Sequence, residues 1–238
     1  MKQLNTYITE YIIKKKLNTP IDSEDHYNYC PKTKSELIEI IKNLLNDNQT
    51  DLNIIDVSKI TDMSELFDKI NQNIEISNIN ISRWDVSNVT NMRYMFFGCS
   101  KFNCDLSSWN VSNVEDITGM FINCVNLNSD FSNWNMHNVT NMKYMFYGCK
   151  KFEGKGLENW DVSNVTNMIS MFEDCANFDC DLSNWNVSNV ISIERMFSDC
   201  VNFTGKGLEN WNIRNVTRMN DIFEKCTSLK NKPSWYKE

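Results

Sequence analysis

The sequence has few histidines and no long apolar run. Only His26 and His137 occur among 238 residues, and neither lies beside an evident nucleophile or acid in the chain. Catalysis by a histidine base needs a positioned partner, so His137 is interpreted as a turn residue of the repeat described below. No stretch approaches the roughly 18 apolar residues that a membrane-spanning helix requires. We therefore expect a non-enzymatic chain without a membrane span.

An excess of positive charge is also absent. Lysine and arginine number 24 against 31 acidic residues, which gives a net charge of -7. Such a chain repels phosphate backbones, and we expect no nucleic-acid partner. The first residues, MKQLNTYITEYIIKKKL, interrupt every apolar pair with polar residues and make a poor signal peptide. The expected location is intracellular or virion-associated, without classical secretion.

A repeat of 25 to 26 residues dominates the chain. Its tryptophans have successive spacings of 25, 25, 26, 25 and 26 residues. They are Trp84, Trp109, Trp134, Trp160, Trp185 and Trp211. Each opens a phrase such as WDVSNVTNMxxMFxxC, and a degenerate copy begins at Ile55. A fixed period of this length indicates stacked structural units.

The spacing within one unit predicts its local structure. Apolar residues three or four apart in VxxMxxMFxxC suit one or two tight helical turns. The segment FxxDLSxW alternates and predicts a brief strand. We therefore predict an α/β repeat solenoid, a leucine-rich-repeat-like stack of about seven coils with short parallel strands, short helical turns and an N-terminal helical cap.

Two further residue types recur at fixed positions of the repeat. We expect a ladder of buried asparagines that satisfy turn backbone groups, namely Asn88, Asn113, Asn138, Asn164, Asn189 and Asn215. Cysteines at another position should point into the core as free thiols, which fits a reducing environment. These are Cys99, Cys124, Cys149, Cys175, Cys200 and Cys226.

The chain before the repeats differs in kind. We predict an amphipathic helix in residues 1–20, a linker and cap helix in 21–50, the repeats in 51–230 and a closing tail in 231–238. Thr33 followed by Glu36 marks the start of the cap helix. The first helix either packs on the cap or docks into a partner with Tyr7 and Tyr11 as anchors.

The repeat phrase, with FxxDLSxW, resembles that of the BspA-like leucine-rich-repeat proteins of bacterial surfaces, mycoplasma lipoproteins and some viral proteomes. The resemblance covers about three quarters of the chain, from Ile55 to about Leu229. It implies a non-enzymatic repeat protein, which several members use for adhesion. We expect this chain to depart from the surface members, because its first residues make a poor signal peptide and the sequence shows no anchor.

Metal and phosphate sites find little support. Cysteine pairs such as Cys99 and Cys104 lack histidine partners for zinc. One aspartate per coil, at Asp105, Asp130 and Asp181, is too few for a calcium ladder. The twin GKGLEN segments after Glu153 and Thr204 lack the spacing of a phosphate loop and account for the 26-residue coils. We expect no cofactor and no metal.

Aromatic and basic residues at outward positions are the candidate binding residues. They are Arg93, Tyr94, Phe97, Lys143, Tyr144 and Tyr147. Exposed aromatics with basic neighbours are typical of interfaces, and the alternative is that they cover the wall between coils.

These patterns favour a non-enzymatic scaffold for protein–protein interaction, binding through the repeat surface or the N-terminal helix. One alternative is a structural or packaged component of a larger assembly, such as a phage or viral particle. Another is an adhesin-like surface protein that binds a host protein or glycan. The expected partner is a protein of unknown identity, and a glycan is possible.

Overall fold

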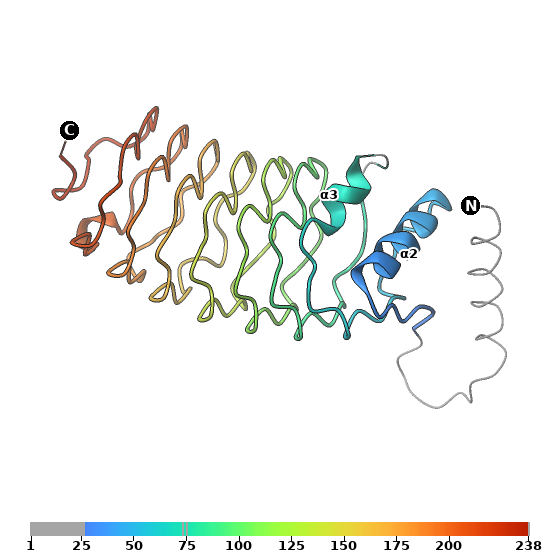
Figure 1. The fold of residues 1–238 in the computed structure, drawn as a ribbon. Helices are drawn as coiled ribbons and strands as arrows, with labels where there is room; N and C mark the ends of the chain where they lie inside the picture. Colours follow the sequence, from blue (N-terminus) through green and yellow to red (C-terminus); the bar gives the residue numbers. More distant parts are fainter. Residues whose placement is uncertain (1–26, 73, 75, 238) are drawn as a thin grey trace.

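The computed structural model describes residues 27–72, 74 and 76–237. Within them the chain winds through successive coils that lie side by side in a row, with the C-terminus at the end opposite α2 (Figure 1). Helix α2 spans Lys34–Asn46, α3 spans Leu66–Asn71, and a short 3-10 turn spans Leu208–Asn210. Turns, isolated bridges and irregular backbone make up the rest of the described chain.

The predicted α/β class with short parallel strands is wrong. The described residues contain two α-helices and no strand or sheet. Neighbouring coils are instead joined by isolated parallel bridges. One bridge links each successive pair along the series Asp62, Asn91, Asp116, Asn141, Asn167, Ser192 and Arg218. The stack is therefore not a leucine-rich-repeat-like solenoid of parallel strands.

Left-handed backbone explains why strands are missing. In the coil that begins at Trp84, Tyr94 has φ 53° and Gly98 has φ 70°. The Met95 N–H donates to the Met92 carbonyl at 3.2 Å, which closes a tight turn between these residues. An extended strand requires φ near -120°, so positive φ at two positions breaks it. The segment predicted as helical turns is a succession of tight turns, and α3 is its helical counterpart in the first coil.

Backbone donors in this segment still find partners in the next coil. The Tyr94 N–H donates to the Thr118 carbonyl at 2.9 Å, and the Gly119 N–H donates to the Lys143 carbonyl at 2.9 Å. These hydrogen bonds all run from one coil to the next one along the chain. Buried backbone groups are thereby satisfied without a sheet.

Short polar side chains form the corners of the coils. The Asp105 carboxylate accepts a hydrogen bond from the Ser107 N–H at 2.9 Å, and the Asn110 side chain accepts one from the Ser112 N–H at 3.1 Å. Aspartate and asparagine stabilise turns by bonding the backbone two residues on. The segment FxxDLSxW, predicted as a strand, is therefore a turn.

The tryptophans form a ladder along the core. Trp109 is 1% exposed, its indole N–H donates to the Ile81 carbonyl at 3.1 Å, and its ring stacks on that of Trp134 with centroids 6.5 Å apart. The indole N–H of each predicted ladder tryptophan donates in the same way to a carbonyl of the preceding coil. Each indole thus buries its ring and satisfies its donor.

The tail extends this ladder rather than breaking it. Trp235 donates to the Leu208 carbonyl at 2.6 Å and stacks on Trp211 with centroids 6.3 Å apart. Tyr236 packs edge-on against Phe223. The last tryptophan lies 24 residues after Trp211 in a segment without the repeat phrase, which is why the sequence pattern did not include it.

The repeat cysteines are buried free thiols, as predicted. The Cys149 thiol donates to the Phe121 carbonyl of the preceding coil at 3.1 Å. The thiols of Cys124, Cys175, Cys200 and Cys226 make the same contact. Burial raises the pKa of Cys124 and Cys149 well above the usual range. These thiols are therefore protonated core groups.

The prediction of buried asparagines is wrong. All six ladder asparagines are exposed. Each still bonds to the neighbouring coil, because its amide nitrogen donates to a carbonyl there, as Asn113 does to Ser87 at 2.7 Å. One donated bond links the coils at their rim, where the amide oxygen remains at the surface.

Helix α2 covers the N-terminal end of the stack. The Thr33 hydroxyl accepts from the Glu36 N–H at 3.2 Å, which confirms the predicted helix start. Leu37 and Ile41 are fully buried, and the Lys34 ammonium lies 2.6 Å from the Asp62 carboxylate. The same ammonium donates to a first-coil carbonyl, that of Ser64, at 3.1 Å. The predicted helix in residues 1–20 lies outside the described residues.

Glycine is required where the longer coils fold back. Gly156 has φ 88°, and a Cβ there would lie 2.2 Å from the backbone nitrogen of Ser132. Beside it, Lys155 pairs with Asp130 at 2.8 Å. The GKG segments are thus tight loops that press against the preceding coil.

Candidate binding surface

The outward positions of the MxxMFxxC segment form one wall of the molecule. Met92, Met95 and Phe96 are fully buried, so the residues between them face outward. The hydrogen bonds from Tyr94 to Thr118 and from Gly119 to Lys143 fix the register of successive coils. Arg93 therefore shares a column with Thr118 and Lys143, and Tyr94 shares one with Gly119 and Tyr144.

Two coils carry the same aromatic arrangement on this wall. The rings of Tyr94 and Phe97 meet edge-on with centroids 6.0 Å apart, and those of Tyr144 and Tyr147 do so at 6.1 Å. The Arg93 guanidinium carbon lies 4.8 Å from the Tyr94 ring centroid. These cation–π contacts hold the rings in place at the surface.

The coil between them supplies small and aliphatic residues. Gly119 leaves room for the Tyr94 ring, since a Cβ there would lie 2.3 Å from its Cε1 atom. Ile122 lies beside it and is 9% exposed, whereas Phe97 is 39% exposed. The two aromatic coils are thus joined into one apolar area. We call this area the aromatic patch, formed by Arg93, Tyr94, Phe97, Gly119, Ile122, Lys143, Tyr144 and Tyr147.

The aromatic residues were interpreted either as binding residues or as residues that cover the wall between coils, and each interpretation describes part of the patch. Tyr94 is half-buried and covers the next coil, as a wall-covering residue would. Phe97 remains available to a partner. Sequence reasoning missed Gly119 and Ile122, although their offset of 25 residues from Tyr94 and Phe97 was a usable signal.

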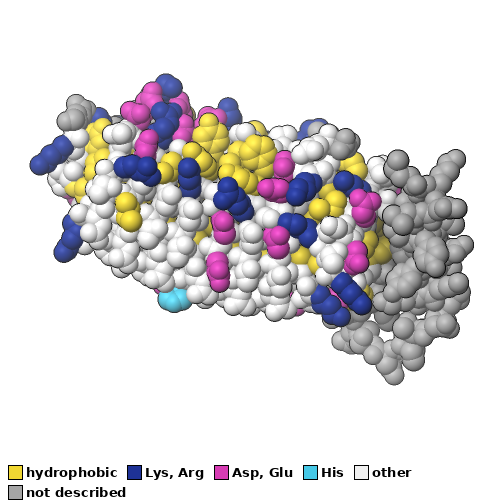
Figure 2. Space-filling view, in the orientation of Figure 1, with side chains coloured by type: hydrophobic (Ala, Val, Ile, Leu, Met, Phe, Trp, Pro, Cys, Tyr) yellow, Lys and Arg dark blue, Asp and Glu magenta, His cyan; other side chains and the backbone are white. Residues whose placement is uncertain are grey.

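A cluster of charges lies next to the patch toward the C-terminal end. Arg195 donates to Glu173 at 2.8 and 3.0 Å and to Glu224 at 3.1 Å. Burial raises the pKa of the Tyr147 hydroxyl, and the negative charges of Glu173 and Asp174 raise it further. Figure 2 shows hydrophobic side chains gathered along the upper side of the molecule, beside a mixed acidic and basic cluster near the C-terminal end.

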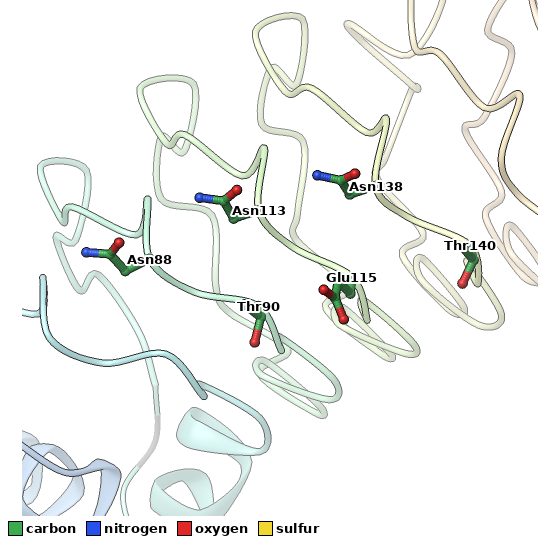
Figure 3. A pocket seen from close by; sticks show the side chains of 6 residues that line it. All are labelled: Asn88, Thr90, Asn113, Glu115, Asn138 and Thr140. Atoms are coloured by element: carbon green, nitrogen blue, oxygen red, sulfur yellow. The ribbon is translucent and has the colours of Figure 1, made fainter.

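An open groove crosses three coils at other positions of the repeat (Figure 3). It has a volume of about 530 Å³ and is lined by Asn88, Thr90, Asn113, Glu115, Asn138 and Thr140. The asparagine nitrogens are engaged with the preceding coils at 2.7 to 2.8 Å. Their oxygens, two hydroxyls and one carboxylate make the lining polar, and it offers no aromatic ring on which a sugar could stack.

The position of His137 corrects one expectation. We expected no acid beside it, but its Nδ1 atom lies 3.3 Å from the Asp161 carboxylate of the next coil. Hydrogen bonds from Ser163 lower the pKa of Asp161, and His137 lowers it further. Both side chains are more than half exposed. His26, Tyr7 and Tyr11 lie outside the described residues.

The recurring aspartates have a structural role. Asp130 and Asp181 accept from the backbone N–H groups of Ser132 and Ser183 at 2.9 Å, like Asp105. In the part of the chain that the structure describes, no group of three or more histidine, cysteine, aspartate or glutamate side chains could hold a metal ion. Nor does any helix in that part have the length and apolar character to cross a membrane.

The family model described as "Mycoplasma protein of unknown function, DUF285" matches residues 35–155 and again 126–236. The chain belongs to the DUF285 family. Two overlapping matches agree with the internal repeat, because one model can align with different coils of a DUF285 chain. No curated protein and no solved structure matches the chain. The DUF285 description assigns no activity, so function rests on the surface itself.

Proposed function

We propose that this DUF285 protein is a non-enzymatic scaffold that binds another protein through its aromatic patch. The observation that carries the proposal is the exposed ring of Phe97, which meets edge-on a Tyr94 ring that packs over Gly119 of the next coil. Aromatic side chains with arginine are the residue types most enriched at the centres of protein interfaces.

The repeated geometry supports a binding role over a packing role. A residue needed only to cover the wall would be needed in every coil, yet the aromatic pair is confined to two coils. The corresponding positions of the later coils carry Ser170 with Glu173, and Arg195 with Ser198. The same scaffold thus forms without aromatic residues at these positions.

The resemblance of the repeat phrase to BspA-like proteins agrees with this proposal, since several members of that family adhere to other proteins. Adhesion to a host protein or glycan, and incorporation into a larger assembly, are the two other functions that the sequence raised. Both would use a partner-binding surface of the same kind.

Affinity capture from native lysate tests the proposal. The bait is the full chain, and the variant changes Tyr94, Phe97, Tyr144 and Tyr147 to Ser. A matched control changes Ile191 and Val201 to Ser, because these are exposed apolar residues elsewhere, at 50% and 37% exposed. We expect the patch variant to lose a specific protein that the control retains, with circular dichroism showing that both fold. Unchanged capture by the patch variant would overturn the proposal.

A further inference from the structure

The aromatic patch carries positive charge that the protein itself does not neutralise. Arg93 and Lys143 lie over their tyrosine rings, and neither has an ion-pair partner among the described residues. Some other cations are paired, such as Lys155 with Asp130, whereas Lys59 and Lys230 are, like Arg93 and Lys143, without an ion-pair partner among the described residues; Arg93 and Lys143 differ in lying on an aromatic surface. Two unneutralised cations on one apolar surface are notable in a chain of net charge -7.

The two cations lie in one column of the wall, two coils apart. The backbone hydrogen bonds of Tyr94 and Gly119 place Thr118 between them. At roughly 5 Å per coil, the cations are separated by about 10 Å. Thr118 and Ile122 of the middle coil are buried, at 4% and 9% exposed, so the apolar surface beside the cations is formed by aromatic rings, of which Phe97 is 39% exposed.

Acidic residues bound this surface at both ends. The Glu65 N–H bonds to the Arg93 carbonyl, which places Glu65 one coil before the patch. The Gly148 N–H bonds to the Glu173 carbonyl, which places Glu173 one coil after it. Both acids are paired within the chain, Glu65 with Lys69 at 3.1 Å and Glu173 with Arg195 at 2.8 Å, so the unpaired positive charge on this wall lies at its centre, where it attracts negative charge on a partner.

We propose that the patch accepts an acidic peptide segment in which two carboxylates, about 10 Å apart, flank apolar side chains. This inference rests on the proposed function and adds the chemistry of the partner. In a helical segment, acidic residues at i and i+7 are about 10 Å apart, and apolar residues at i+3 and i+4 lie on the same face. The carboxylates pair with Arg93 and Lys143, and the apolar residues pack against the exposed Phe97 ring.

Fluorescence anisotropy with three matched peptides tests this inference. Each is a helix-forming peptide of about 15 residues with Leu at i+3 and i+4, and the residues at i and i+7 are Glu, Gln or Lys. We expect the Glu peptide to bind at least about tenfold more tightly than the Gln peptide, and the Lys peptide to bind most weakly. Added salt should reduce the difference.

A charge-matched pair of variants locates the effect. Changing Arg93 and Lys143 to Gln should reduce affinity for the Glu peptide about tenfold. Changing Lys59 and Lys230 to Gln removes the same charge from exposed positions elsewhere and should leave affinity within about twofold. Equal loss in both variants would mean attraction to net charge alone and would overturn the inference.

The outcomes separate this inference from the proposed function. If lysate capture depends on the aromatic residues but the Gln or Lys peptide binds as well as the Glu peptide, the acidic partner is wrong and the scaffold function stands. If no peptide binds and capture still depends on the patch, the conclusion is the same. If capture does not depend on the patch, the proposed function fails and this inference fails with it.

Discussion

At the scale of single residues, close backbone contacts make some glycines irreplaceable. Gly156→Ala should lower the free energy of unfolding by at least about 2 kcal/mol, because φ 88° strains alanine and its Cβ would meet the Ser132 nitrogen at 2.2 Å. Chemical denaturation of the purified variant measures this change.

Gly98→Ala is the matched control. Gly98 also has positive φ, at 70°, but nothing lies nearer than 3.7 Å to its added Cβ. We expect a loss of about 1 kcal/mol, which is the backbone cost alone. Equal losses at the two positions would show that the close approach at Gly156 contributes nothing.

Residue-level patterns predicted the interior better than the rim. The spacing of Trp109 and Cys149 indicated core positions, and both are buried. The exposure of Asn113 was missed, because the same amide can bond a neighbouring coil from inside or from the surface. Positive φ at Tyr94 was also not predictable, since tyrosine has no preference for that conformation.

At the scale of elements, α2 is held to the first coil by one buried face and one ion pair. Lys34→Ala should lower the free energy of unfolding by about 1 kcal/mol at pH 7, because both partners of the Lys34–Asp62 pair are partly exposed. Lys42→Ala, in the same helix and half-buried, is the control and should change stability by less than about 0.5 kcal/mol.

The pH dependence of this pair has a definite sign. Burial alone would raise the pKa of Asp62, but hydrogen bonds from Lys34 and Ser64 bring it below its usual value. The lowered pKa means that the contribution is full above the unfolded-state pKa of about 3.9 and is lost as the pH falls through the folded-state value. The difference between wild type and Lys34→Ala should therefore be constant from about pH 7 to 5 and shrink below about pH 4. A difference that grows on acidification would contradict this assignment.

Elements were predicted well where capping signals exist and poorly where apolar spacing stood alone. Thr33 and Glu36 predicted the start of α2 correctly, because a capping residue determines one local geometry. The spacing of Met92, Met95 and Cys99 fits helical turns and tight turns equally well. The same ambiguity affected the candidate patch. Its outward residues could be identified from the sequence, but the contact between the Tyr94 ring and Gly119 could not, because it depends on the turn geometry.

At the scale of the whole molecule, each coil contacts its two neighbours. The position of a substitution along the stack therefore determines how many coils it destabilises. Trp134 stacks on Trp109 and Trp160 and is 3% exposed. Trp134→Ala should cost about 3 to 5 kcal/mol and uncouple the coils on either side. Urea denaturation should show a lower midpoint, with separate transitions for the two halves.

Trp235→Ala is the comparison at the end of the stack. Trp235 stacks on Trp211 and is partly exposed, so we expect a smaller loss, with faster hydrogen exchange confined to the last coils. Similar losses and similar exchange patterns for the two variants would show that the molecule unfolds as one unit, and would contradict a nearest-neighbour stack.

The repeating hydrogen bonds between coils give the molecule a modular construction. In the MxxMFxxC segment every middle coil donates N–H groups to the coil after it, as Gly119 does to Lys143, and elsewhere in the repeat it donates to the coil before it, as Glu115 does to Thr90. A coil copied in frame would meet both neighbours with the same complementary edges. A tandem duplication or deletion of one period could therefore lengthen or shorten the protein without a new interface, while moving the two ends, and any residues displayed between them, by a fixed step.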